Sequence, residues 1–232
     1  RPGLLAIDHV VLAHALGLPI DGVARPSQSD VDELLNADGR EGDAMIRITL
    51  SGGLSEQSGA VLWMRTSPLP LMTSPEGFVL GTSLPVQARP LAAYKTLNYW
   101  PNRLLYEQAR RDGFDEALIV SPSGEVLEGS RTNVFIGVKG RLHTPPADGR
   151  ILPGIMRGMV IETALQLGIE VQQRTMDFRE AKVEAEEIFL TNSGRGIIPV
   201  SRWEGTQYPA PGPITDRLWR TLKPRLDSGE LS

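Results

Sequence analysis

The sequence predicts an α+β protein of two lobes, and three observations lead to this fold class. Segments with apolar residues at helical spacing are mixed with segments in which apolar and polar residues alternate, as in chains that combine helices and strands. Several predicted strands follow one another through Gly-containing turns, which favours hairpins over a doubly wound parallel sheet. Residues 83–93 contain two prolines and little periodicity, so we expect them to link lobe 1–82 to lobe 94–232.

The N-terminal lobe is predicted to begin with two helices and to continue with strands. Residues 4–16 have apolar residues at helical spacing and end before Gly17, a residue type that commonly follows a helix. A short helix is expected after Ser29 and Asp30, which can cap it. Strands are expected at 44–50, 60–65 and 77–80, between Gly/Ser and Pro turns.

The C-terminal lobe is predicted to contain helices, hairpins and further strands. A helix is expected over 98–113, where Pro101 is tolerated because it lies in the first turn. A second helix is expected to open at Leu152-Pro153-Gly154 and to end at Gly168. The remaining predicted elements are the hairpins 117–120/125–128 and 132–138/141–144, the strands 169–173 and 187–190, and a helix over 214–226 interrupted near Pro224.

Composition excludes several classes of protein. The chain has 232 residues, 24 Lys+Arg, 28 Asp+Glu, a net charge of −4 and no cysteine. Disulfide scaffolds, Cys-ligated metals and thiol nucleophiles are therefore excluded, and the acidic balance gives no electrostatic footprint for nucleic acid. No apolar run approaches the roughly 20 residues that cross a bilayer, and no signal peptide opens the chain. We expect a cytoplasmic protein that binds neither nucleic acid nor membrane.

The histidines do not indicate a metal site. His9 and His14 are five residues apart, whereas two ligands on one helix face are four apart, and His143 lies far along the chain. Gly-x-Gly-x-x-Gly and Walker-type fingerprints are absent as well. We therefore predict no metal, and we look for chemistry in other residues.

Two segments carry residues suited to amine chemistry. Lys95 follows the predicted linker; most lysines are solvated surface charges, but a buried amine has a lowered pKa and can condense with an aldehyde to a Schiff base. Glu128 ends a strand inside an apolar run, which is an unusual place for an unpaired charge. The alternative is a strand-end carboxylate paired with Arg131.

Two further segments could bind an anion. Pro153 and Gly154 open the predicted helix, and the unpaired N–H groups of a helix N-terminus favour an anion. Residues 189–194 leave a strand for a turn rich in hydroxyl groups and glycine, which could add N–H and O–H donors to the same anion. Taken alone, each segment could equally be an ordinary helix start or turn.

Together and in this order, the four segments resemble the fold-type IV pyridoxal-phosphate enzymes, the class IV aminotransferases. This family includes branched-chain aminotransferase, D-amino acid aminotransferase and aminodeoxychorismate lyase. The resemblance runs from about Leu91 to Gly205, and the preceding residues match only loosely. The matching motifs are Lys95-x-x-Asn98-Tyr99, Asp115-Glu116-Ala117-Leu118, Glu128-Gly129-Ser130 with Asn133-Val134-Phe135, Thr144-Pro145-Pro146, Leu152-Pro153-Gly154-Ile155-x-Arg157, Glu187-x-Phe189 and Ile198-Pro199-Val200.

The resemblance implies a D-amino acid aminotransferase-like fold, with a small N-terminal α/β lobe and a larger C-terminal α/β lobe that binds pyridoxal 5′-phosphate. It implies that Lys95 is the catalytic lysine that forms the Schiff base with the cofactor. Glu128 resembles the carboxylate that pairs with the pyridine nitrogen. The other implied cofactor-binding residues are Ile155 and Met156, through their backbone amides, together with Asn192, Ser193 and Tyr99.

The chain also departs from the family pattern. Relatives supply a phosphate-binding arginine from an early helix, but Asp8 stands at the expected position. The strands that usually precede this helix are absent, so we expect a truncated or unusually short small lobe. The spacing of Tyr99 from Lys95 differs by one residue from that in branched-chain enzymes. Arg47 is similar in place to an arginine near their substrate; the alternative is an outward charge on an alternating strand.

Three functions remain open. The first is an aminotransferase that moves an amino group between a small amino acid and a 2-oxo acid. The second is an aminodeoxychorismate lyase, which Gly154-Ile155-Met156-Arg157 and the turn at Asn192 favour weakly. The third is a non-catalytic relative, suggested by the missing arginine. Family resemblance also implies a homodimer whose subunits complete each other's pockets.

Overall fold

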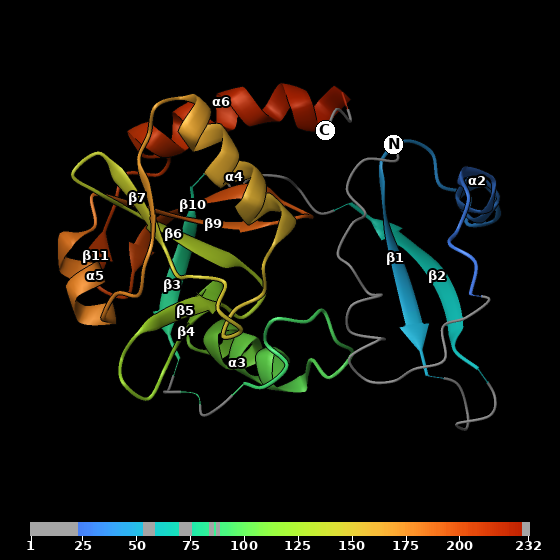
Figure 1. The fold of residues 1–232 in the computed structure, drawn as a ribbon, viewed down its shortest axis with the longest axis horizontal. Coiled ribbons are helices and arrows are strands. Elements are labelled where there is room, and N and C mark those ends of the chain that lie inside the picture. The colour runs from blue at the N-terminus through green and yellow to red at the C-terminus, as the bar shows by residue number, and fades with distance from the viewer. Residues whose placement is uncertain (1–22, 53–58, 70–75, 84–85, 87–88, 229–232) are drawn as a thin grey trace. The chain divides into compact units, whose positions relative to one another are not determined.

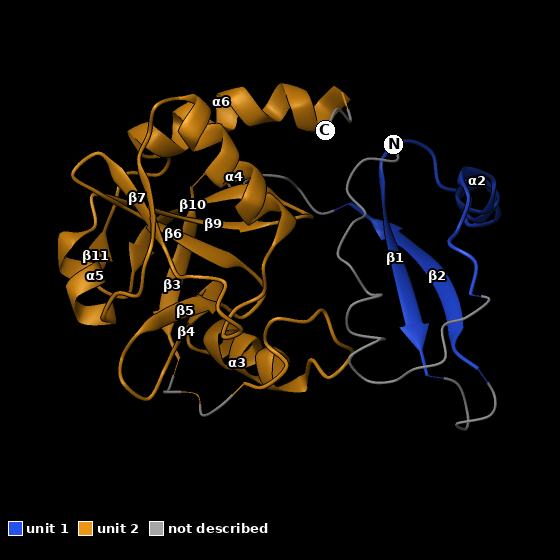
Figure 2. Cartoon of the chain, viewed as in Figure 1, with its two compact units in different colours: residues 1–70 blue, residues 71–232 orange. Residues whose placement is uncertain are grey.

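The chain forms two compact units, residues 1–70 and residues 71–232 (Figure 2). The computed structural model describes residues 23–52, 59–69, 76–83, 86 and 89–228. The helix predicted over 4–16 and part of the predicted linker lie outside these residues. No helix within the described ranges has the length and apolar character needed to cross a membrane.

The described part of the first unit is a helix followed by a hairpin (Figure 1). Helix α2 spans Gln28–Ala37, and strands β1, Ala44–Ser51, and β2, Val61–Pro68, pair antiparallel. The helix is capped by Ser27 rather than by the predicted Ser29. The Ser27 hydroxyl accepts the Asp30 N–H at 3.2 Å, and the Asp30 carboxylate accepts the Ser27 N–H at 2.7 Å. This reciprocal capping box starts the helix two residues earlier than predicted.

The second unit is built on a nine-stranded sheet within its described residues. The strand order is β5-β4-β3-β10-β9-β6-β7-β8, with β11 paired to β10. The strands are β3 Phe78–Thr82, β4 Glu116–Val120, β5 Val126–Gly129, β6 Asn133–Val138, β7 Arg141–Thr144, β8 Val171–Gln173, β9 Glu187–Asn192, β10 Gly196–Trp203 and β11 Thr206–Gln207. Both predicted hairpins are present, since β4 pairs antiparallel with β5 and β6 with β7.

Four helices of the second unit are described (Figure 1). They are α3 Trp100–Arg111, α4 Ile155–Gln166, α5 Phe178–Glu184 and α6 Pro213–Ser228. Pro101 lies in the first turn of α3, as predicted. The interruption predicted near Pro224 is wrong, because α6 continues through it. Pro224 is exposed, so water can hydrate the carbonyl that loses its helical partner.

The structure moves one predicted strand into the second unit and adds two elements that were not predicted. The strand predicted at 77–80 was placed in lobe 1–82, but β3 pairs in parallel with β4 and β10 and so belongs to the sheet of the second unit. The units divide between Pro70 and Leu71, ahead of this strand. Strand β10 was not predicted, because Gly196 and Pro199 disfavour regular strands. Helix α5 was missed because it is short and buries only Ala181.

The two faces of β6 and β9 have different neighbours. Val134, Ile136 and Leu190 point into the main hydrophobic core. The alternate residues point the other way, where Phe135 stacks on Phe189 with ring centroids 4.9 Å apart. On that second face the carboxylate of Glu187 in β9 meets the start of α6, so the face is covered by helices and not by solvent.

Glu187 provides a test of this packing. Its carboxylate accepts the N–H of Ile214 at 2.9 Å and the N–H of Thr215 at 2.8 Å, and it is 3% exposed. Glu187→Ala leaves these donors buried without a partner, so we expect a loss of about 2 kcal/mol in the free energy of unfolding. Urea denaturation followed by circular dichroism measures this loss.

Glu170→Ala is the matched control, because Glu170 pairs with Arg141 at an exposed position. Exposed ion pairs contribute little to stability, so the control should unfold close to wild type. Equal midpoints for Glu187→Ala and Glu170→Ala would show that the start of α6 does not depend on Glu187.

Candidate active site

Lys95 lies in the segment that leads into α3. Its side chain is exposed in this structure, so of the two alternatives weighed from the sequence it is the solvated lysine and not the buried amine. The Lys95 ammonium lies 5.4 Å from the centre of the Tyr99 ring, and its charge acts on Glu128, where it lowers the pKa of the carboxyl. The structure therefore brings the lysine, the tyrosine and the glutamate into one neighbourhood.

Glu128 is 5% exposed, at the end of β5. One carboxylate oxygen, Oε1, pairs with Arg89 at 2.8 Å, and the other, Oε2, accepts the Leu152 N–H at 3.0 Å. Asn133 also donates to Oε2, at 3.4 Å. The alternative pairing of Glu128 with Arg131 is wrong, since the Arg131 guanidinium lies 3.4 Å above the Tyr106 ring.

Burial and charge act against each other on this carboxyl. Desolvation is the largest influence and raises the pKa of Glu128, while the Arg89 charge and the Leu152 amide lower it. Sequence reasoning missed Arg89, which lies in the segment taken as a linker. No spacing pattern marks two residues 39 positions apart (128 − 89) as partners.

Tyr99 ties the start of α3 to the turn after Glu128. Its hydroxyl donates to the Ser130 carbonyl at 2.7 Å, and the Asn102 amide donates to the same carbonyl at 2.8 Å. Burial, together with the charge of Glu116, raises the pKa of Tyr99 to about 12. The phenol therefore stays protonated at neutral pH and keeps its hydrogen bond.

The N-terminus of α4 is not capped by any side chain. The N-cap residue is Gly154, and Ile155 and Met156 are the first two residues of the helix. A Cβ atom at position 154 would overlap the side-chain oxygen of Asn133, so only glycine fits there. Asn133 also donates to the Leu152 carbonyl at 2.8 Å, which holds the approach to the helix. The first amides of α4 thus form a fixed set of donors suited to an anion.

The turn after β9 is organised by its own asparagine. The side-chain oxygen of Asn192 accepts the N–H of Gly194 at 3.1 Å and the N–H of Arg195 at 2.8 Å. These two amides are therefore already used inside the turn, although the sequence suggested that the turn would offer donors to a ligand. Ser193 is exposed at the tip, and the hydroxyl of Thr191, just before the turn, has no hydrogen-bond partner.

Arg47 lies in the first unit, exposed on β1 and directly opposite Arg65 of β2. The two units are described separately, so the substrate-binding role of Arg47 stays a prediction.

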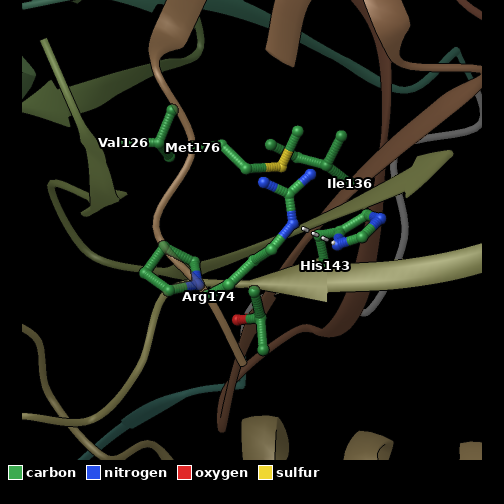
Figure 3. Close-up of a pocket in the computed structure, with 7 residues that line it drawn as sticks. Val126, Ile136, His143, Arg174 and Met176 are labelled. Carbon is green, nitrogen blue, oxygen red and sulfur yellow. Dashed lines mark hydrogen bonds between the residues drawn. The ribbon is translucent and has the colours of Figure 1, made fainter. Parts of the chain in front are cut away.

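Figure 3 shows a pocket elsewhere in the second unit. It has no room for a water molecule and is lined by Val126, Ile136, His143, Thr144, Pro145, Arg174 and Met176. Arg174 donates to Nδ1 of His143 at 3.1 Å, and burial together with the charge of Arg174 lowers the pKa of His143. A neutral imidazole can accept this hydrogen bond, so the pair has a structural role that needs no ligand. None of the predicted site residues lines the pocket.

Comparison with known proteins agrees with this geometry. A family model described as amino-transferase class IV matches residues 13–203. The branched-chain-amino-acid aminotransferase of Escherichia coli K12 is 36% identical over 131 residues, which are 56% of this chain and 42% of that enzyme. The chain thus covers less than half the length of this relative.

Solved structures extend the similarity to the fold. The branched-chain aminotransferase of Thermoproteus uzoniensis, solved with norvaline, superposes with a TM-score of 0.82 at 26% identity, covering 95% of this chain and 77% of that one. A Legionella pneumophila protein provisionally named 4-amino-4-deoxychorismate lyase gives a TM-score of 0.79 at 26% identity, covering 93% and 82%. A branched-chain aminotransferase from Thermobaculum terrenum, with a TM-score of 0.75, was solved in its pyridoxal-phosphate form.

The described residues fit this cofactor. A buried carboxylate, a nearby lysine, an uncapped helix N-terminus and an unpartnered hydroxyl are the groups that a pyridine nitrogen, an aldehyde and a phosphate require. The family match covers most of the chain, and the solved structures share its fold. The chain belongs to the class IV aminotransferases, the fold-type IV family of enzymes.

Proposed function

We propose that this protein is a pyridoxal-phosphate-dependent aminotransferase that moves an amino group between a small amino acid and a 2-oxo acid. The observation that carries the proposal is the position of Glu128, a buried carboxylate that is paired with Arg89 and influenced by the Lys95 charge. The names of the branched-chain relatives support transfer as the reaction. We further propose a cytoplasmic homodimer, in keeping with the family resemblance.

Each residue has a role in this proposal. Bound pyridoxal phosphate supplies an aldehyde that condenses with amines and a protonated ring that accepts an electron pair. Lys95 provides the amine for the Schiff base and afterwards moves a proton at its Nζ. Glu128 holds the proton on the ring nitrogen, and Arg89 keeps that carboxylate ionised.

The phosphate end and the substrate end use other residues. The amides of Ile155 and Met156 hold the phosphate at the start of α4, with Ser193 and the turn built by Asn192 beside it. Tyr99 contributes by fixing the segment that carries Lys95, since its hydroxyl is bonded to Ser130. Arg47 binds a carboxylate of the substrate, a role that suits an exposed guanidinium.

A lyase is the second candidate. The Legionella relative, of which this chain covers 82%, supports the same lysine chemistry followed by elimination. A reaction that releases pyruvate and 4-aminobenzoate from aminodeoxychorismate would establish the lyase. Transfer that depends on 2-oxoglutarate would establish the aminotransferase, and activity with neither substrate set would favour the non-catalytic alternative.

Lys95 gives the first test. In Lys95→Ala the aldehyde has no amine to condense with, so we expect the visible absorption band of the wild type with pyridoxal phosphate to be absent. The readout is the spectrum before and after borohydride, which fixes the linkage to the protein. Mass spectrometry then locates the adduct.

Lys223→Ala is the control, because Lys223 is an exposed lysine paired with Asp227 in α6. It should keep the wild-type band. A band that survives in Lys95→Ala and disappears in another lysine variant would refute the assignment of Lys95.

Arg89 gives a second test. Arg89→Met leaves Glu128 buried without its cation, so we expect a loss of about 3 kcal/mol in the free energy of unfolding at pH 8. Burial already raises the pKa of Glu128, so the folded state takes up a proton more readily than the unfolded state. Stability then falls as pH rises from the ordinary carboxyl pKa through the raised one, and more steeply in Arg89→Met. Urea denaturation at pH 5 and pH 8 measures both slopes.

Two variants control this experiment. Arg89→Met with Glu128→Gln removes the charge and should restore the shallower pH dependence. Arg150→Met breaks a partly exposed pair with Glu125 and should show a smaller loss. Identical pH slopes in wild type and Arg89→Met would mean that Arg89 does not control the ionisation of Glu128.

A further inference from the structure

Three buried side-chain polar atoms of the described residues have no hydrogen-bond partner: Nε of Arg157 and the hydroxyls of Thr163 and Thr191. A buried hydroxyl without a partner is costly, so each such group in a native protein calls for an explanation, and a bound ligand is one. Thr191 is 1% exposed, so bulk water does not satisfy its hydroxyl.

Strand register places Thr191 beside Asn133, a residue that contacts the start of α4. Thr191 of β9 lies directly opposite Asn133 of β6, so both side chains are on the same face of the sheet. Asn133 reaches Gly154 so closely that a Cβ there would overlap its oxygen. The unpartnered hydroxyl therefore lies on the face of the sheet that meets the uncapped N-terminus of α4.

Charge at this helix end also favours an anion. Arg157 is the third residue of α4 and is 5% exposed, and its guanidinium donates to the Pro145 carbonyl and the Gln173 side chain, each at 2.9 Å. No carboxylate in the described part of the chain forms an ion pair with it. A buried cation adds to the positive end of the helix dipole, an arrangement that an anion stabilises.

We propose that the Thr191 hydroxyl donates to the phosphate group bound at the N-terminus of α4, as a ligand additional to the amides of Ile155 and Met156. The oxygens of a phosphate dianion accept hydrogen bonds, so they complement a hydroxyl donor and free amides, and the positive charge of Arg157 in the first turn of α4 adds to the attraction. The inference rests on the proposed function and adds a residue to its phosphate site. Thr163 has the same unpartnered hydroxyl but lies in the third turn of α4, away from the helix start.

The test compares Thr191→Val with Thr163→Val in the whole protein. Both changes remove one buried, unpartnered hydroxyl and keep the shape of the side chain. Titrations followed by absorbance give the dissociation constants of pyridoxal phosphate and of pyridoxal, which lacks the phosphate. We expect Thr191→Val to weaken pyridoxal phosphate about tenfold, with no change for pyridoxal, and Thr163→Val to change neither.

Thr191→Ser keeps the hydroxyl and should bind pyridoxal phosphate like the wild type. If circular dichroism shows that Thr191→Val does not fold, the comparison of Thr191→Ser with Thr191→Ala replaces it. Equal affinities in Thr191→Val and Thr163→Val, or an equal loss for pyridoxal phosphate and pyridoxal, would overturn the inference.

Failure of the proposed function has a different signature. In that case borohydride fixes no cofactor to Lys95 of the wild type. Inorganic phosphate titrated by calorimetry into wild type and Thr191→Val still tests the hydroxyl. Weaker phosphate binding in the variant supports the inference, while equal binding, or no binding to either protein, overturns it.

Discussion

The buried carboxylate of Glu128 is the constraint on which the rest of the site depends. Burying a charge is costly unless both oxygens find partners, and here Arg89, Leu152 and Asn133 supply them. Arg89 precedes Lys95 by six residues, and Leu152 precedes the first residue of α4 by three (95 − 89 and 155 − 152). The hydrogen bonds and ion pair of one carboxylate therefore fix both the segment that leads to Lys95 and the segment that leads into α4.

The two faces of the sheet carry different kinds of residue: one packs in the hydrophobic core, and the other carries polar residues of the candidate site. Along β6 and β9, the residues that point into the core are aliphatic, whereas Asn133 and Thr191 lie on the opposite face at the end that meets α4. Alternation along a strand thus lets neighbouring residues serve different purposes. Asn133 lies so close to Gly154 that a side chain at position 154 would overlap it.

The sequence predicted the elements that follow local rules. Helix α3 with Pro101 in its first turn and the two hairpins were found because capping, turn and alternation signals are local. Strand β10 was missed because Pro199 usually breaks a strand. The partner of Glu128 and the unpartnered hydroxyl of Thr191 have no local signal, since they depend on residues that only the fold brings together. The choice between a buried and a solvated Lys95 also stayed open, because sequence shows the chemistry of a side chain but not its exposure.

Because the start of α4 has no side-chain cap, ligand binding there would affect the stability of the fold. A helix whose first donors are left for a ligand is less stable without that ligand, because no side chain satisfies them. A ligand that binds only the folded state stabilises it by about 2.7 kcal/mol when its free concentration is 100 times the dissociation constant. Under the proposed function, chains without the cofactor would unfold and be degraded first, so the abundance of this protein in a cell would follow the supply of pyridoxal phosphate.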